Sequence, residues 1–548
     1  MQSKHSPGPG QYAHGPRGEP ATPPQAHRST HHAAPRNATR RVRAGFVSLA
    51  VACAAALAAP VSIASVQGVL DNAIRAADLR DTRVAYLVMD LDTGEVLGER
   101  SPDDLVIPAS NLKLFTSAAA LGTLGPEFSF QTRLRWVQLE ATPGTPGMEK
   151  AQSLLVVQGG GDPAFGDPKV LQLTPPEALK GTAYEGQKLD VDLMLRIWVD
   201  LVVAKGIKQI DRLLLDDRVF DDRLVHESWP RDQLHLWYCA PVSGLNFHAN
   251  TVDLHVEPAG EGQPPVVRGM PRSSYYTLQN RAITGTTQTV WATRRPESAV
   301  LMLAGRVQQG TIEPLVLSLP DPPMYLGVTL ADRLKLAGVA VGSVGRMGQA
   351  ESLPAGELLH TVQTPLIQVI TRCNKDSQNL YAEALLKRLG RQLSGAAGSW
   401  PTGVAALRDF LQKRFGVQAA RVQAQDGSGL SAGNRVTARV TVELLRAMHR
   451  DRALARIYRD SLAEGGKDGS LGPKNFDAAS INSRLFAKTG FINGVRSLSG
   501  YLVHTRPDGQ ERVIGFSLYF NDDKPGVYGH VIRDLRNRMV QLIDQRTR

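Results

Sequence analysis

Residues 108–122 read PASNLKLFTSAAALG, with a serine, Ser110, three residues before a lysine, Lys113, at the start of an apolar run. Apolar or small residues follow at the spacing of one helix face: Leu112, Phe115, Ala119 and Gly122. Because residues three apart share a helix face, the Lys113 amine would lie one turn from the Ser110 hydroxyl. A lysine whose pKa is lowered by burial or by a neighbouring cation can take the serine proton. The pattern therefore predicts a nucleophilic serine with a lysine base.

Ser110 is expected in the first turn of this helix, where free backbone N–H groups and the helix dipole favour developing negative charge. Its own N–H would then supply half of an oxyanion hole. The motif is weak when taken alone, because about one Ser-x-x-Lys is expected by chance in a chain of 548 residues. Its interpretation therefore depends on partners elsewhere in the chain.

A second motif, Ser377-Gln378-Asn379, stands just before another apolar helical stretch. A hydroxyl at Ser377 would relay a proton between Lys113 and a leaving group. The amide of Asn379 would hydrogen-bond both a substrate backbone and Lys113. Serine and asparagine also cap ordinary helices, so a structural role is the alternative for both residues.

A third motif, Lys488-Thr489-Gly490, lies on a predicted strand at residues 484–491. The turn signal Asn493-Gly494 and a strand pattern at 495–503 follow, which predicts a hairpin. A lysine and a hydroxyl that face a cleft would hold a substrate carboxylate, and the glycine would let the substrate backbone approach the strand. The alternative is a solvated strand lysine.

Strand patterns occur near both ends of the chain. Residues 84–90 and 96–98 form a predicted hairpin, and C-terminal strands are expected at 484–491, 495–503 and 513–520. Helical patterns at 66–77 and 527–545 flank these strands. Together they predict an α+β fold, with a five-stranded antiparallel sheet covered by the first and last helices.

The central region divides into two parts. Helical patterns at 365–389, 403–415 and 441–451 predict an all-helical lobe against the sheet. Residues 132–334 are instead rich in strand patterns and Gly/Pro turns, with one helical patch at 191–205. We therefore expect one domain made of residues 65–131 and 335–548, and a strand-rich insertion of one or two subdomains at 132–334.

The N-terminal residues have a different composition. Residues 1–38 are rich in Pro, Gly, His and Ala, which is typical of disorder. Three arginines then precede an apolar run at 44–59, as in a secretion signal, although an uncleaved signal anchor has the same pattern. Residues 1–64 hold seven Lys or Arg and one Glu, and so +6 of the net charge of +11. We expect residues 1–64 to be a disordered N-terminus with a signal peptide, and the remainder to be extracytoplasmic, in the periplasm.

Several other functions find little support. No basic run is interleaved with aromatic residues, which argues against nucleic-acid binding; the basic surface is either solvated or weakly attracted to anionic envelope polymers. Cys239 and Cys373 remain beyond the signal, and they either form a disulfide or are two separate buried thiols. No CxxC or nearby His pair accompanies them, so no metal site is predicted. Residues 159–161 are not a dinucleotide loop, because Asp162-Pro163 interrupts the glycine spacing.

Taken in order, the three motifs resemble those of the penicillin-recognising serine acyl-transferases. Their spacings, 267 and 111 residues, leave room for the insertion after the first motif. That pattern is similar to the class C low-molecular-mass penicillin-binding proteins of peptidase family S13, the D-alanyl-D-alanine carboxypeptidase/endopeptidase group. The resemblance covers roughly residues 66–545. Further stretches agree with it: 159–163 (GGGDP), 244–247 (GLNF), 426–431 (DGSGLS) and 436–437 (VT).

The resemblance implies a penicillin-binding/β-lactamase-like transpeptidase fold. It implies a serine DD-peptidase that cleaves D-alanyl bonds of peptidoglycan stem peptides through an acyl-enzyme, needs no metal or organic cofactor, and has β-lactams as covalent inhibitors. Backbone N–H groups of Ser110 and Phe491 would form the oxyanion hole. The implied side-chain roles are the nucleophile Ser110, its base Lys113, the proton shuttle Ser377, and the substrate-binding residues Asn379, Lys488, Thr489 and Gly490.

One position departs from the family, and two other functions stay open. Ser or Thr often follows the Lys-Thr-Gly motif, whereas Phe491 keeps the backbone N–H but lacks a second hydroxyl for the substrate carboxylate. One alternative is an enzyme of the same fold that hydrolyses β-lactams or small esters, which needs a base for the deacylating water that the sequence does not locate. The other is a non-catalytic cell-wall-binding scaffold, which has no need of all four candidate Ser and Lys side chains. Carboxypeptidase and endopeptidase action are not distinguished.

Overall fold

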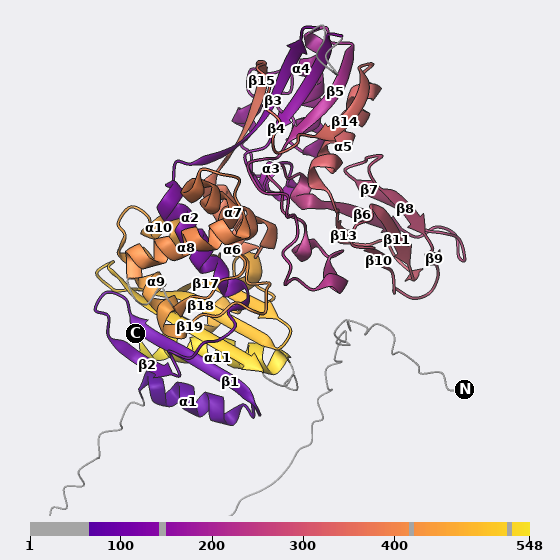
Figure 1. Cartoon of the computed structure of the whole chain (residues 1–548). Coiled ribbons are helices and arrows are strands. Elements are labelled where there is room, and N and C mark those ends of the chain that lie inside the picture. The colour runs from indigo at the N-terminus through magenta and orange to yellow at the C-terminus, as the bar shows by residue number, and fades with distance from the viewer. Residues whose placement is uncertain (1–64, 142–149, 416–420, 523–528) are drawn as a thin grey trace, which may run out of the picture. The chain divides into compact units, whose positions relative to one another are not determined.

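The computed structural model describes residues 65–141, 150–415, 421–522 and 529–548 (Figure 1). The expected secretion signal lies outside these ranges. In the part of the chain that is described, no helix combines the length and the apolar character that a bilayer-spanning segment needs.

A six-stranded antiparallel sheet joins strands from the two ends of the described chain, in the order β16-β17-β18-β19-β1-β2. The strands are β1 (Thr82–Asp90), β2 (Val96–Arg100), β16 (Ala463–Glu464), β17 (Arg484–Ile492), β18 (Val495–Thr505) and β19 (Glu511–Asp522). The five predicted strands are all present. The sixth, β16, is only two residues long and leaves no alternating pattern in the sequence.

The two faces of this sheet pack against different helices. Successive side chains of a strand point to opposite faces, and Tyr86 and Leu87 accordingly enter different cores. Tyr86 packs with the helices α1 (Val66–Ala76) and α11 (Gly529–Arg546), which are the first and last helices predicted to cover the sheet. Leu87 faces the helical lobe on the other side.

The helical lobe is present where the sequence predicted it (Figure 1). Its helices are α2 (Leu112–Leu124), α6 (Leu366–Lys375), α7 (Asn379–Ser394), α8 (Trp400–Phe415), α9 (Ala438–Arg450) and α10 (Ala455–Asp460). Helix α2 is present where the spacing of Leu112, Phe115 and Ala119 predicted it, but its burial is not confined to that face. Every residue from Leu112 to Leu121 is buried, because this helix lies inside the largest core between its neighbouring helices and the sheet.

The helix predicted at 365–389 is interrupted. Helix α6 ends at Lys375 and α7 begins at Asn379, with Ser377 at a φ of 60° between them. This left-handed backbone conformation is uncommon for residues other than glycine. Apolar residues recur on both sides of the break at helical spacing, so the periodicity conceals it. The break places Ser377 on a short linker rather than on a regular helix.

The insertion contains a five-stranded sheet in the order β14-β5-β4-β3-β15. Its strands are β3 (Ser129–Leu139), β4 (Gln152–Gln158), β5 (Gln209–Asp216), β14 (Ala340–Arg346) and β15 (Glu357–Pro365). The predicted helix α4 (Val191–Ala204) connects the parallel strands β4 and β5. Helix α5 (Pro322–Leu336) is an unexpected element. Two prolines at its start had indicated a turn, but proline is well placed in a first helical turn, and Asp321 caps this one by accepting from the Met324 N–H.

Smaller sheets complete the insertion, in the orders β13-β6-β7, β10-β11-β8 and β12-β9. The elements are β6 (Thr251–Glu257), β7 (Val266–Met270), β8 (Thr277–Asn280), β9 (Ile283–Thr284), β10 (Trp291–Arg294), β11 (Val300–Ala304), β12 (Arg306–Val307), β13 (Leu315–Ser318) and α3 (Pro168–Leu171). Since β15 pairs with β3, the expected borders at 132 and 334 would divide one sheet. We propose 129–365 as the bounds of the insertion.

Cys239 and Cys373 are two separate buried thiols and do not form a disulfide. Cys373 lies on α6 of the helical lobe, whereas Cys239 ends a short 3₁₀ turn of the insertion. Burial raises the pKa of the Cys373 thiol to about 11 and that of Cys239 to about 12. Both thiols therefore stay protonated and unreactive at neutral pH.

Candidate active site

Ser110 lies in a 3₁₀ turn, Ala109–Asn111, that leads directly into α2. Two glycines from distant parts of the chain press against this turn, Gly429 from a loop and Gly490 from strand β17. A Cβ atom on Gly429 would lie 1.8 Å from the Ala109 carbonyl oxygen, and one on Gly490 would lie 3.1 Å from the Ser110 nitrogen. At Gly429 the obstructing atoms are backbone, and at Gly490 the nearest are Ser497 Oγ at 2.1 Å and the Pro108 carbonyl oxygen at 2.9 Å, so neither position has space for a side chain. The turn that carries the serine is thus fixed by tight backbone packing.

The Lys113 amine is fully buried and directed at Ser110. Its Nζ donates to Ser110 Oγ at 3.0 Å, to Asn379 Oδ1 at 2.6 Å and to the Ser428 carbonyl oxygen at 2.9 Å. Burial lowers the pKa of Lys113 to about 8, although Cys373 and the carboxylates of Glu383 and Asp426 act in the opposite direction. Near neutral pH a usable fraction of this lysine is therefore neutral and able to accept a proton.

Ser377 and Lys488 form a second pair beside the first. Lys488 Nζ donates to Ser377 Oγ at 2.9 Å and to the Thr489 carbonyl oxygen at 2.9 Å. Burial, followed by repulsion from the Lys113 cation, holds the pKa of Lys488 well below its usual value. Lys113 contacts Asn379 and Lys488 contacts Ser377, and these two partners are only two residues apart in the chain. The two lysines therefore belong to a single polar cluster. The structure thus brings the three sequence motifs together.

Asn379 connects this cluster to the insertion. Its Oδ1 accepts from Lys113, and its Nδ2 donates to the Tyr238 carbonyl oxygen at 2.8 Å. Because Nδ2 can only donate and Oδ1 can only accept, the two contacts fix the orientation of the amide. The alternative role as a simple helix cap is not seen, since α7 has no side-chain cap hydrogen bond.

The strand β17 presents the third motif along an open edge. This strand pairs with β16 only at Phe486 and Ala487, so the edge from Lys488 onward has no strand partner among the described residues. Thr489 Oγ1 donates to Ser470 Oγ at 2.8 Å. The Phe491 side chain is 62% exposed, and the Arg496 guanidinium carbon lies 3.5 Å from its ring centroid. This stacked pair stands where a hydroxyl often follows the motif.

Two buried carboxylates behind Lys113 were not identified as site residues from the sequence. Glu383 accepts hydrogen bonds from the backbone N–H groups of Gly427 and Ser428, each at 2.8 Å, and from Trp400 Nε1 at 2.8 Å. Asp426 accepts from the Gly429 N–H at 2.9 Å and from Trp229 Nε1 at 3.1 Å. These bonds hold the loop whose Ser428 carbonyl receives Lys113. The available signal was that Glu383 stands four residues after Asn379, on the same helix face.

The charge of Asp426 also affects Glu383. Burial, and then the negative charge of Asp426, raise the pKa of Glu383 to about 7. Glu383 is therefore close to half-protonated at neutral pH. The charge behind Lys113, and with it the electrostatic support of the lysine ammonium, therefore changes near neutral pH.

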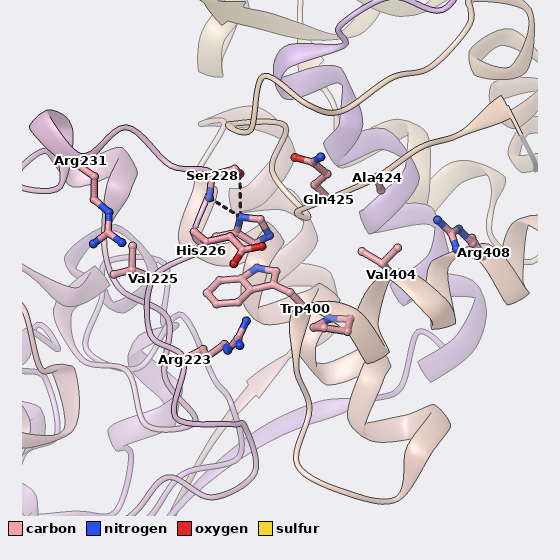
Figure 2. A pocket seen from close by; sticks show the side chains of 12 residues that line it. Arg223, Val225, His226, Ser228, Arg231, Trp400, Val404, Arg408, Ala424 and Gln425 are labelled. Carbon is pink, nitrogen blue, oxygen red and sulfur yellow. Dashed lines mark hydrogen bonds between the residues drawn. The ribbon is translucent and has the colours of Figure 1, made fainter.

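Trp400 also lines a pocket of about 670 Å³ between residues 223–231 of the insertion, the start of α8 and residues 424–425 (Figure 2). The His226 ring packs edge-on against Trp400, with ring centroids 5.1 Å apart. None of the predicted site residues lines this pocket. It is therefore distinct from the cluster around Ser110, from which the Glu383 carboxylate separates it.

Comparisons with known proteins agree with this geometry. A family model described as the D-Ala-D-Ala carboxypeptidase 3 (S13) family matches residues 66–546. A D-alanyl-D-alanine carboxypeptidase from Actinomadura sp. (strain R39) is 32% identical over 454 residues, which are 79% of this chain and 77% of the relative. D-alanyl-D-alanine carboxypeptidase DacB from Haemophilus influenzae is 21% identical over 438 residues, 78% of this chain and 83% of the relative.

Solved structures show the same fold. The crystal structure of penicillin binding protein 4 (dacB) from Haemophilus influenzae has a TM-score of 0.66 and 18% sequence identity, and the match covers 86% of this chain and 99% of that chain. A second structure of that protein, complexed with a β-lactam, has a TM-score of 0.62 and 17% identity, over 87% and 99% of the two chains.

Proposed function

The chain belongs to the D-Ala-D-Ala carboxypeptidase 3 (S13) family, and on that premise we propose which of its groups performs each step of the reaction. It is a serine DD-peptidase of peptidoglycan stem peptides, as the family and its relatives establish. The observation that carries the assignment of roles is the Lys113 amine, which is buried and donates to both Ser110 Oγ and Asn379 Oδ1.

Ser110 is the nucleophile in this proposal, and Lys113 is its base. As Ser110 Oγ attacks the carbonyl carbon of the penultimate D-alanine, its proton moves to neutral Lys113 Nζ, 3.0 Å away. Asn379 Oδ1 and the Ser428 carbonyl are acceptors for the ammonium that results. They hold the amine in line with the hydroxyl and stabilise its positive charge.

The leaving amine needs a proton when the peptide bond breaks. Ser377 supplies it in this proposal, because its hydroxyl stands between the Lys488 amine, 2.9 Å away, and the cleft. The C–N bond breaks, the amine departs with that proton, and an ester remains on Ser110. The proton that Lys113 took from Ser110 replaces the one that Ser377 has given up, so Lys113 is neutral again. Water then attacks the ester, Lys113 takes a proton from it, and that proton returns to Ser110 Oγ as the peptide leaves as a carboxylic acid.

The edge of β17 suits a peptide substrate. The close approach of Gly490 to the Ser110 nitrogen supports the assignment of the backbone N–H groups of Ser110 and Phe491 as the oxyanion hole. Thr489 and Lys488 bind the terminal carboxylate, and the glycine leaves room for the substrate backbone. With Phe491 in place of a second hydroxyl, the carboxylate is held by fewer donors.

We further propose that the protein acts outside the cytoplasm. The supporting observations are the cell-wall substrate of its family and the arginine-led apolar run at residues 44–59. N-terminal sequencing of protein recovered from fractionated cells is the test. A mature N-terminus near residue 65 in the extracytoplasmic fraction is expected, and a full-length cytoplasmic chain would refute the proposal.

Mass spectrometry after penicillin treatment tests the nucleophile. We expect one covalent adduct, located on Ser110 and absent in Ser110→Ala. An adduct that persists in Ser110→Ala would assign the nucleophile to another residue. Assays on a stem pentapeptide and on a cross-linked dimer then measure the carboxypeptidase and endopeptidase rates separately. Rapid release of the penicilloyl group would favour the β-lactam-hydrolysing alternative over the peptidase.

A further inference from the structure

A second strongly charged pocket lies away from the catalytic cluster. Its volume is about 590 Å³, and it is formed by the start of β3, the glycine-rich turn after β4, the loop after β5 and the C-terminal half of α7. Four arginines and one carboxylate line it: Arg133, Arg218, Arg388, Arg391 and Asp216. The glycines of this turn, Gly159 and Gly160, were noted in the sequence but have no part in the catalytic cluster.

The single carboxylate of the pocket, Asp216, already forms an ion pair with Arg218. Arg218 Nε donates to Asp216 Oδ1 at 2.7 Å, and Arg218 Nη2 donates to Oδ2 at 3.2 Å, so these two charges cancel. In the described part of the chain, no carboxylate lies within ion-pair distance of the other three arginines. Arg391 donates to the Gly395 carbonyl oxygen at 2.6 Å, and Arg133 donates to Gln131. The pocket therefore carries an excess of about three positive charges.

Arg388 is the least satisfied of the four. Its guanidinium lies over the Phe128 ring, 5.0 Å from the centroid, and among the described residues it has no hydrogen-bond acceptor. Burial, and then the neighbouring Arg391 cation, lower the pKa of Arg388. A half-buried cation without an acceptor or a counter-charge is costly, and an oxyanion in the pocket would remove that cost.

Gln158 indicates that a ligand of the pocket should also carry a hydrogen-bond donor. Its Nε2 donates to Asp216 Oδ2 at 3.3 Å, which turns Oε1 away from that carboxylate. Oε1 is buried and has no hydrogen-bond partner among the described residues. An unmet buried acceptor needs an N–H or O–H donor. The chemistry that fits the pocket is thus an anion that also carries a donor, such as a peptide with carboxylates and amide N–H groups.

The pocket is separate from the catalytic centre, although one helix carries both. Asn379 begins α7, and Arg388 follows nine residues later. Nine residues are two and a half helical turns, so the two side chains leave opposite faces, about 14 Å apart along the axis. A ligand held by Arg388 is therefore not the peptide segment attached to Ser110.

We propose that this arginine pocket binds the carboxylates of a second peptidoglycan stem peptide, one that is not being cleaved. The inference rests on the proposed function, because peptidoglycan peptides supply both the carboxylates and the amide donors. Arginine pairs with carboxylate through two parallel hydrogen bonds, and two adjacent arginines would bind the multiple carboxylates of one peptide.

The test uses full-length protein whose Ser110 has been acylated with penicillin, so that the catalytic site is blocked. The probe is the stem tripeptide L-Ala-γ-D-Glu-L-Lys, and its fully amidated form is the matched ligand without carboxylates. Calorimetric titration should show binding of the tripeptide and at least about tenfold weaker binding of the amidated form, the loss of a charge-assisted pair. Absence of tripeptide binding to the acylated protein would overturn the proposal.

The variants identify the site. In the double variant with Arg388→Gln and Arg391→Gln, tripeptide binding should fall by at least about tenfold, whereas Arg408→Gln, an exposed arginine of α8, should leave it unchanged. Arg388→Lys keeps the charge but loses the paired hydrogen bonds, so it should bind the tripeptide more weakly than the unsubstituted protein and more tightly than Arg388→Gln, and this order can be measured even if the double variant is poorly folded. Equal binding by all variants would overturn the assignment to this pocket.

Two further readouts separate the possible failures. Pyrophosphate that binds the pocket when the tripeptide does not would point to a phosphate-bearing polymer and would refute the peptide assignment. Penicillin acylation and pentapeptide hydrolysis should be unchanged in the arginine variants. If the unsubstituted protein is acylated by penicillin but does not bind the tripeptide, only the pocket proposal is refuted. If the unsubstituted protein is not acylated at Ser110, the proposed catalytic roles are refuted as well.

Discussion

The carboxylate of Glu383 accepts a 2.8 Å hydrogen bond from the backbone N–H of Ser428, whose carbonyl accepts a 2.9 Å bond from Lys113. The backbone of a single residue, Ser428, thus links the buried acid to the buried amine. Because Glu383 also binds the Gly427 N–H and the Trp400 indole, the loop has little freedom to move away from Lys113. The acid acts as a positioning residue and does not touch the serine.

Replacement of this acid tests the relationship. In Glu383→Gln one amide nitrogen would face N–H donors, so at least one buried donor would lose its acceptor. We expect a loss of about 1–3 kcal/mol in the free energy of unfolding and slower acylation by penicillin. Urea unfolding and stopped-flow acylation measure the two effects. Glu443→Gln, at a half-buried glutamate of α9, is the matched control, and an equal effect there would contradict a specific role for Glu383.

The pH dependence of acylation follows from the pKa of Lys113. The base must be neutral, and its pKa of about 8 lies below the usual value because of burial. The acylation rate should therefore rise about tenfold per pH unit below pH 8 and level off above it. A chromogenic β-lactam measures the rate, and Lys113→Met should remove both the dependence and a factor of about 10²–10⁴ in rate. A flat profile between pH 6 and pH 9 in the unsubstituted protein would disprove the lysine-base assignment.

The packing of Gly429 against the serine turn predicts a position-specific loss. Gly429 has a φ of 83°, and its Cβ would collide with the Ala109 carbonyl. Gly206 has a similar φ of 74° with no atom within 4 Å, so Gly206→Ala adds the same backbone strain without a collision. Gly206→Ala should lose about 1–2 kcal/mol of stability from backbone strain alone. Gly429→Ala should lose more because of the collision, and only this variant should also lose penicillin acylation. Normal acylation in Gly429→Ala would show that the turn tolerates displacement.

Phe491 offers a gain-of-function test. Phe491→Ser would restore a hydroxyl after the Lys-Thr-Gly motif and free the stacked Arg496 guanidinium. An added hydrogen bond of about 0.5–1.5 kcal/mol should lower KM for a stem pentapeptide by roughly two- to tenfold, with kcat little changed. Phe491→Leu removes the stacking without adding a hydroxyl and serves as control. Steady-state kinetics that show the same KM in both variants would exclude a carboxylate contact at this position.

The site residues that could be predicted from the sequence are those that lie in short local motifs. Ser110, Lys113, Ser377 and Lys488 belong to short motifs with a mechanistic reason, and the structure brings them into one cluster. Of the two acceptors that orient Lys113, the Asn379 amide was predicted and is found. The other is the Ser428 carbonyl, a backbone group that every residue possesses, so its role depends on tertiary packing alone and could not be anticipated.

Most strands and helices of the fold could also be predicted from local sequence patterns. The predictions failed where a local pattern is compatible with more than one structure. Apolar runs bounded by turn signals identified β1, β17, β18 and β19, which are buried along most of their length. The break at Ser377 was missed although residues 374–379 are all polar and include Ser and Asn, which often cap helices, because the apolar residues of α6 and α7 keep helical spacing on its two sides. Helix α5 was missed because a proline pair fits a turn as well as a first helical turn.

The wedging of the Ser110 turn between Gly429 and Gly490 has a consequence for biogenesis. The nucleophile is held by a loop and a strand that are made long after it during synthesis, so a nascent or partly assembled chain has an ordinary, unactivated serine. Reactivity toward penicillin then arises only when the last strands have docked. Covalent labelling during refolding would consequently report the completion of the domain rather than the formation of its first helix.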